Sequence, residues 1–311
     1  MNGPAPPQRA RGSPGTCYGF QVASTLPFAY LRDGTGIPLE VTCDAPPAFG
    51  PAARLLREWP ARPGRTLLAR LYQEGGRYFF WIETEEVFVV DPAVPRIVVP
   101  EADPIRREDI LWGTPASLCL LHQGHLPLHA AAVEVDGGAI LLAAPGGFGK
   151  TTLAAAFYAA GYRVLSEDVT CITTQAPPSV IPGPASLRLR PDVIDYLHLP
   201  RAEVVRRSDV RVSLALDPSS RGRCDPVPLR AVAFLRVAPE IAMTRVKATD
   251  AIADLWVLSQ SHPDDAALAR CFAHVVDLAR DVPVWNVYRP LRFDALADTV
   301  GTILSTCLAD A

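Results

Sequence analysis

The sequence lacks the features that mark membrane proteins and nucleic-acid-binding proteins. No apolar run reaches the roughly 20 residues that cross a bilayer, and residues 1–16 have no apolar core of the kind that a signal peptide needs. There is no basic run, and the formal net charge is −3. We therefore expect a folded protein with no membrane and no nucleic acid among its partners.

The sequence also has no closely spaced pair of cysteines and has few lysines. The seven cysteines are scattered, and no two form a C-x-x-C pair, which argues against a disulfide frame or a zinc site and favours reduced thiols in the cytoplasm. Only Lys150 and Lys247 stand against a large excess of arginine. Because the sequence otherwise uses arginine for positive charge, the lysine at position 150 suggests that this position needs a compact point charge.

Lys150 falls in a stretch that predicts a strand, a glycine-rich turn and a helix. The apolar run Ile140–Ala144 predicts a buried strand, and Leu153–Ala160 favours a helix that Gly161 ends. Val164 and Leu165 then start another strand, which delivers two acids. The turn and the acids consist of Pro145, Gly146, Gly147, Phe148 and Gly149, then Lys150, Thr151 and Thr152, and finally Glu167 and Asp168.

This order of residues is typical of a phosphate-binding loop. Glycines let successive backbone N–H groups converge on phosphate oxygens, and the helix N-terminus adds partial positive charge. The lysine reaches the outer phosphates, and the hydroxyl of Thr151 can hold Mg²⁺ together with an acid on a nearby strand. One position departs from the full pattern, because Ala144 stands where a glycine is usual. An ordinary strand-turn-helix with glycines for packing is the alternative.

Three histidines precede the loop, at positions 122, 125 and 129. Gly124 and Pro127 break any regular face, so we do not expect a shared metal shell. His129 opens the predicted strand Ala130–Val135, which the turn Asp136-Gly137-Gly138 connects to the strand before the loop. His129 is therefore expected beside the phosphate loop, although a hydrogen-bonded histidine at a strand end fits the same pattern.

Together these residues resemble the HPr kinase/phosphorylase C-terminal domain superfamily. The resemblance is to its kinase-like relatives, including the kinases that phosphorylate lasso-peptide precursors, and it covers about residues 105–311. It rests on Leu128–Val133, the following hairpin, the loop, and Leu165–Val169, with further similar stretches at Ile181–Asp192, Pro228–Leu235 and Val282–Val287.

The resemblance implies an α/β fold with a P-loop kinase core of the HPr kinase/PEP carboxykinase-like type. It implies ATP and Mg²⁺ as cofactors, with Lys150 on the outer phosphates and with Thr151 and Asp168 on the metal. Glu167 would take the proton from the acceptor hydroxyl, a position where the family usually has aspartate, and His129 would orient that acid. The acceptor would be a serine of a peptide or protein, and a homo-oligomer would fit because HPr kinases form hexamers.

Other functions stay open on the sequence. The glycine- and isoleucine-rich signature of true HPr kinases is missing after the acids, which argues against HPr itself as substrate. A small-molecule kinase would share the site, and a regulatory nucleotide-binding module would need Lys150 and Asp168 but no base. Glu167→Gln is expected to silence a kinase and leave such a module intact. The arginine that would clamp phosphate has four candidates, namely Arg188, Arg190, Arg221 and Arg223.

Three segments are expected along the chain. Residues 1–17 are rich in Pro, Gly and Arg and predict a disordered tail. Residues 18–105 predict a β-rich N-terminal domain, with strand candidates at Tyr18–Val22, Arg77–Ile82 and Glu86–Val90. Residues 106–311 would form the catalytic domain, beginning with a helical pattern from Arg106 to Leu121.

Overall fold

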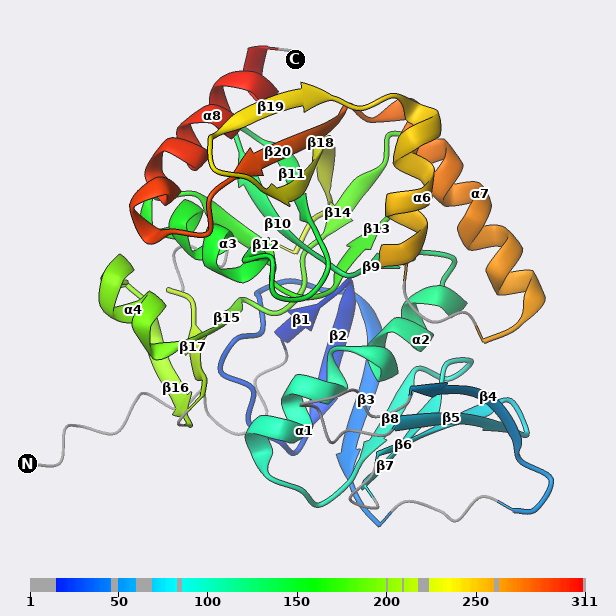
Figure 1. Cartoon of the computed structure of the whole chain (residues 1–311). Helices are drawn as coiled ribbons and strands as arrows, with labels where there is room; N and C mark the ends of the chain where they lie inside the picture. Colours follow the sequence, from blue (N-terminus) through cyan, green and yellow to red (C-terminus); the bar gives the residue numbers. More distant parts are fainter. Residues whose placement is uncertain are drawn as a thin grey trace, which may run out of the picture.

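The computed structural model describes residues 15–45, 50–59, 69–82, 86–199, 201–208, 210–217, 224–259 and 263–309. These residues form a mixed α/β fold with sheets of eight, nine and three strands (Figure 1). None of the helices among them is long and apolar enough to cross a bilayer.

The eight-stranded sheet is built from the N-terminal third of the chain and has the order β1-β2-β3-β8-β7-β6-β5-β4. The aromatic side chains of Phe79 and Phe80 in this sheet are buried. Its strands are β1 (Gly15–Cys17), β2 (Phe20–Ser24), β3 (Ile37–Cys43), β4 (Arg54–Trp59), β5 (Ala69–Glu74), β6 (Arg77–Ile82), β7 (Glu86–Asp91) and β8 (Arg96–Val99).

Two expectations for the N-terminal residues are wrong. Gly15–Cys17, assigned to a disordered tail, form the buried strand β1; residues 1–14 lie outside the described part. The strand expected over Tyr18–Val22 is interrupted, because Tyr18 and Gly19 have φ angles of 54° and 76° and turn β1 into β2. The turn at Tyr18 has no proline, asparagine or aspartate to mark it.

The helix expected over residues 106–121 is two helices, α1 (Pro104–Leu111) and α2 (Thr114–His122). Gly113 caps α2, and Pro115 lies in its first turn, where a missing backbone N–H costs nothing. The apolar pattern continues through the break because Trp112 is itself buried. Helix α2 packs both against β7 of the eight-stranded sheet and against Leu126–Leu128 of the nine-stranded sheet.

The nine-stranded sheet has the order β12-β10-β11-β18-β14-β13-β9, with β20 pairing β18 and β19 pairing β20. The hairpin between β10 and β11 is confirmed, with Asp136 and Gly137 at φ 47° and 72°. Its strands are β9 (Leu126–Leu128), β10 (Ala130–Val135), β11 (Gly138–Ala143), β12 (Arg163–Ser166), β13 (Thr170–Ile172), β14 (Ser179–Ile181), β18 (Val227–Val237), β19 (Ala242–Arg245) and β20 (Val284–Arg289).

Helices cover both faces of this sheet (Figure 1). Ile140 and Leu142 of β11 pack in one core with α3 (Lys150–Ala159) and α8 (Leu296–Ala309), whereas Leu141 faces a second core with α6 (Ala248–Leu258) and α7 (Asp265–Asp281). Because both faces are buried, β11 is a continuous apolar run. A short 3-10 helix, η1 (Phe293–Ala295), precedes α8.

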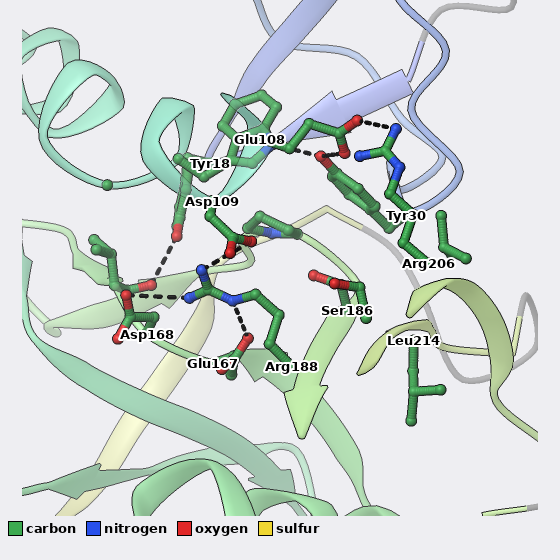
Figure 2. Close-up of a pocket in the computed structure, with 16 residues that line it drawn as sticks. Tyr18, Tyr30, Glu108, Asp109, Glu167, Asp168, Ser186, Arg188, Arg206 and Leu214 are labelled. Atoms are coloured by element: carbon green, nitrogen blue, oxygen red, sulfur yellow. Dashed lines mark hydrogen bonds and ion pairs between the residues drawn. The ribbon is translucent and has the colours of Figure 1, made fainter. Parts of the chain in front are cut away.

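The three-stranded sheet lies beside α3 and has the order β15-β17-β16. It consists of β15 (Ser186–Leu189), β16 (Glu203–Arg207) and β17 (Val212–Ala215), and the helix α4 (Pro191–Leu197) follows β15. The sheet matters for the site because Arg188 of β15 points to Glu167 and Asp168, and Arg206 of β16 points to Glu108 across the pocket (Figure 2).

Candidate functional site

The loop between β11 and α3 places Lys150 at the first turn of the helix. Gly147 and Gly149 have φ angles of 89° and 77°, a conformation that favours glycine. The Lys150 side chain is 6% exposed, and its Nζ donates to the carbonyl oxygens of Ala144 at 2.8 Å and Pro145 at 3.3 Å. Burial lowers the pKa of Lys150, against the opposing effect of Asp168 and Glu167.

His129 connects that lysine to the acids. It immediately precedes β10, and its backbone N–H donates to Leu258 O at 2.7 Å. Its Nε2 is 3.0 Å from Lys150 Nζ, and its Nδ1 is 3.1 Å from the carbonyl oxygen of Asp168 and 3.3 Å from Oδ1 of that residue. In the neutral tautomer with hydrogen on Nδ1, Nδ1–H donates to Asp168 and Nε2 accepts from the Lys150 ammonium. Burial lowers the pKa of His129, and the charge of Lys150 acts in the same direction.

Glu167 and Asp168 lie in the turn that follows β12, and they point to different partners. The Thr151 hydroxyl donates to Glu167 Oε1 at 3.1 Å. Glu167 is 7% exposed and burial raises its pKa. The side chain of Asp168 is 44% exposed. Burial acts to raise the pKa of Asp168, but the charges of Arg188 and Lys150 hold it below the ordinary value.

Arg188 of β15 joins the two acids. Its guanidinium lies 3.0 Å from Glu167 Oε2, 3.2 Å from Asp168 Oδ2 and 3.1 Å from Asp109 Oδ1 of α1. The charge of Glu167 is the largest cause that raises the pKa of Arg188. Of the other candidate arginines, Arg190 pairs with Asp192, and Arg221 and Arg223 lie outside the described residues.

The turn that carries the acids is held by residues from the N-terminal sheet. Arg32 is fully buried and donates to the carbonyl oxygens of Val164 at 2.9 Å and Leu165 at 3.0 Å, just before the acids. The Tyr18 hydroxyl donates to Val169 O at 2.8 Å, just after them. Sequence reasoning missed both residues, because no local motif marks a side chain that acts 130 or more positions away.

A pocket of about 620 Å³, including the solvent at its mouth, opens beside the acids (Figure 2). Its far wall comes from the N-terminal part of the chain, where the Tyr30 hydroxyl donates to Glu108, and Glu108 also pairs with Arg206 of β16 at 2.7 Å. The lining residues are Tyr18, Tyr30, Glu108, Asp109, Trp112, Gly113, Glu167, Asp168, Val169, Pro184, Ser186, Arg188, Val205, Arg206, Ser213 and Leu214.

The structure thus gathers most of the expected side chains at one place. Lys150, His129 and Asp168 are joined in series, Thr151 donates to Glu167, and Arg188 bridges the two acids. The metal shell expected from Thr151 and Asp168 is not what the contacts favour, since the Thr151 hydroxyl donates to Glu167. The two acids share Arg188, but Thr151 contacts Glu167 whereas His129 contacts Asp168.

The residues that are present suit a magnesium-bound polyphosphate. A threonine hydroxyl and a carboxylate supply the oxygen donors that Mg²⁺ prefers, and a glycine loop at a helix N-terminus with a lysine supplies donors for phosphate oxygens. Among the described residues, no group of three or more histidine, cysteine or acidic side chains forms a metal cluster. Any metal at Thr151 would therefore keep other oxygen ligands.

Comparison with known proteins gives matches among solved structures. No family model matches the chain, and no curated protein matches it. Among solved structures, the Hpr(Ser) kinase/phosphatase from Coxiella burnetii is similar at 10% sequence identity and a TM-score of 0.33, over 59% of this chain and 97% of that one. A similarity at this level establishes neither the fold nor the activity of the chain.

Proposed function

We propose that the chain is an ATP-dependent kinase with a P-loop core of the HPr-kinase-like type, which transfers the γ-phosphate to a hydroxyl group. The observation that carries this proposal is the convergence of Lys150, Thr151 and two carboxylates at the edge of a pocket. A nucleotide-binding loop alone would need no pocket on the far side of its acids, whereas a transfer reaction needs a place for the acceptor.

The loop and its lysine would hold the phosphates. Pro145, Gly146, Gly147, Phe148 and Gly149 form the loop, and Lys150, Thr151 and Thr152 begin the helix behind it. Lys150 would exchange its hydrogen bonds with loop carbonyls for phosphate oxygens. Thr151 and Glu167 would hold Mg²⁺, which when bound supplies positive charge to a loose, anionic transition state.

Asp168, not Glu167, is then the better base. Its side chain is partly exposed to the pocket, its depressed pKa keeps it ionised at neutral pH, and His129 orients it through Nδ1. A carboxylate works as a base when it lies within hydrogen-bond reach of the acceptor hydroxyl, so position counts for more than basicity. This assignment exchanges the roles that the sequence resemblance implies for the two acids.

The acceptor would enter the pocket of Figure 2, next to Asp168. A serine side chain of a peptide or protein fits this arrangement, with the rest of the substrate outside. A small hydroxyl compound that reaches Asp168 through the same opening is the second candidate. Arg188, which already contacts both acids, would add positive charge where the phosphate transfers.

The proposal is tested by ATP consumption with hydroxyl-bearing peptides and small molecules, read by mass for one added phosphate. Asp168→Asn should lower kcat at least 100-fold, the range of general-base loss, with little change in the Kd for Mg·ATP. Glu167→Gln should instead raise the Mg²⁺ concentration needed for half-maximal binding of ATP.

Two outcomes would contradict parts of the proposal. If Asp168→Asn binds Mg·ATP and transfers phosphate as well as the wild type does, Asp168 is not the base. If the wild type binds Mg·ATP but phosphorylates no acceptor and hydrolyses none of the nucleotide, the regulatory-module alternative replaces the kinase.

A further inference from the structure

A buried arginine from outside the loop motif lies against the loop. Arg289 is the last residue of β20, and it is 2% exposed. Its guanidinium donates to the carbonyl oxygen of Phe148 at 2.8 Å and approaches that of Gly149 at 3.4 Å. A Cβ added to Gly149 would lie 2.6 Å from the same guanidinium nitrogen. Glycine is therefore favoured at position 149 by its φ of 77°, and an added Cβ would displace the Arg289 guanidinium.

The charge of Arg289 has no counter-charge in the described part of the chain. No carboxylate there pairs with it, its Nε has no hydrogen-bond partner, and burial lowers its pKa. Arg188 and Arg206 of the same region are each paired with acids. A buried, unpaired charge costs several kcal/mol, so a structural role alone explains Arg289 poorly.

The hydrogen bonds of Arg289 also orient the loop. In a trans peptide unit the C=O and the N–H point in opposite directions. Phe148 O faces Arg289, and Gly149 O faces both Arg289 and the N–H of Leu153, at 2.9 Å. The N–H groups of the same two peptide units, which belong to Gly149 and Lys150, must then point to the other side, away from the guanidinium and the helix.

We propose that Arg289 is the positioning residue of this anion site. It turns the Gly149 and Lys150 amides towards the ligand, and its unpaired charge is balanced when a polyphosphate binds. The inference rests on the proposed nucleotide binding, and it extends the site to a strand that lies about 140 positions beyond the loop. Bound polyphosphate, rather than an acidic side chain, supplies the missing negative charge.

The test uses Arg289→Met, which keeps the length of the side chain and removes the charge and the hydrogen bonds. Calorimetry would measure the Kd of the full chain for Mg·ATP and for inorganic pyrophosphate, and urea unfolding without ligand would measure stability. We expect each Kd to rise about tenfold or more, the effect of losing hydrogen bonds from a charged group. Stability without ligand should stay unchanged or rise, because the buried charge is gone.

The matched control is Arg236→Met. Arg236 lies on the neighbouring strand β18, opposite Tyr288, but it pairs with Asp254 and donates to Asn286. Arg236→Met should leave both Kd values unchanged. If Arg289→Met fails to fold, Arg289→Lys takes its place, with a rise in Kd of at least threefold expected because one ammonium cannot hold both carbonyls as the planar guanidinium does.

The outcomes separate this inference from the proposed function. Equal affinities of the wild type and the Arg289 variant for pyrophosphate would overturn the inference, as would an equal rise in Kd for Arg236→Met. A wild type that binds Mg·ATP without transferring phosphate overturns the kinase alone. A wild type that binds neither ligand overturns both.

Discussion

His129 lies between the cation and the anion of the site, with Lys150 on Nε2 and Asp168 on Nδ1. Such a position requires the neutral ring, because a protonated ring has no acceptor for the lysine. Its lowered pKa has the same consequence. The histidine therefore acts as a fixed connector at neutral pH, and protonation would break the contact with the lysine.

This arrangement predicts a pH dependence. A histidine whose pKa is lowered by folding binds fewer protons in the folded state, so stability is complete above the ordinary value of about 6.5 and is lost as the pH falls below it. We expect the free energy of unfolding and kcat to fall between pH 7.5 and 5.5. His129→Gln should reduce the slope of the unfolding free energy in this range, measured by urea unfolding at each pH.

Part of the slope should remain in that variant, because burial also lowers the pKa of His125 and His274. Burial raises the pKa of Glu167, which contributes in the opposite direction. His274→Gln, far from the loop in the sequence and on α7, is the control: it should remove its own part of the slope and leave kcat unchanged. An identical slope for the wild type and the His129 variant would contradict the role of the neutral ring.

Residues of the site differ in how far their partners lie along the chain, and this decided what could be predicted. Lys150 and Thr151 follow the glycines directly, so a local sequence motif is enough to predict their position. Arg188 was one of four candidates, because its three carboxylates come from two distant segments. Arg289 was missed, since a single arginine at the end of a strand carries no pattern, and only the fold brings it to Gly149.

At the scale of elements, helix α3 begins and ends at glycines in the left-handed conformation. Gly149 caps the N-terminus with φ 77°, and Gly161 follows the C-terminus with φ 94°. The two glycines face different surroundings. A Cβ at Gly161 would meet nothing within 4 Å, whereas one at Gly149 would meet Arg289. Substitutions at these two glycines therefore distinguish the effect of backbone strain from the effect of contact with Arg289.

We predict different effects for alanine at these two positions. Each substitution should lower the free energy of unfolding by about 1–2 kcal/mol, the cost of a left-handed alanine. Gly149→Ala should also raise the Kd for Mg·ATP at least tenfold, because Arg289 must move from the loop; Gly161→Ala should leave that Kd unchanged. Urea unfolding and calorimetry measure the two quantities. Equal Kd values for both variants would show that the loop tolerates the displacement.

The helices and strands that a local sequence pattern marks lie where the sequence predicts them, and the exceptions have physical causes. The hairpin between β10 and β11 is confirmed because Asp136 and Gly137 suit its turn. The helix over residues 106–121 was predicted as one piece, since the buried Trp112 hides the break at Gly113. Arg221 and Arg223, two of the candidate phosphate-clamping arginines, lie outside the described residues, so their role stays a prediction.

At the scale of the whole molecule, the boundary expected near residue 105 does not separate two independent bodies. The N-terminal sheet shares a core with Cys171 and Ile181 of the nine-stranded sheet and with Val169, which precedes β13. Arg32 and Tyr18 bind the backbone on both sides of the acids. The N-terminal part thus supports the acids and forms the far wall of the pocket. No motif in its sequence predicts either role.

This coupling predicts an effect of Tyr18→Phe, which removes only the hydroxyl that binds Val169 O. We expect the free energy of unfolding to fall by about 1 kcal/mol and kcat to fall severalfold at saturating acceptor, because the backbone after Asp168 loses its hydrogen bond. The Kd for Mg·ATP should not change, since Lys150 and its loop are untouched. Tyr78→Phe is the control, because Tyr78 is also buried and lies in β6 of this sheet, and its hydroxyl accepts a hydrogen bond from Gln73; it should leave kcat unchanged. Equal kcat values for both variants would mean that the N-terminal sheet adds stability without placing the acids.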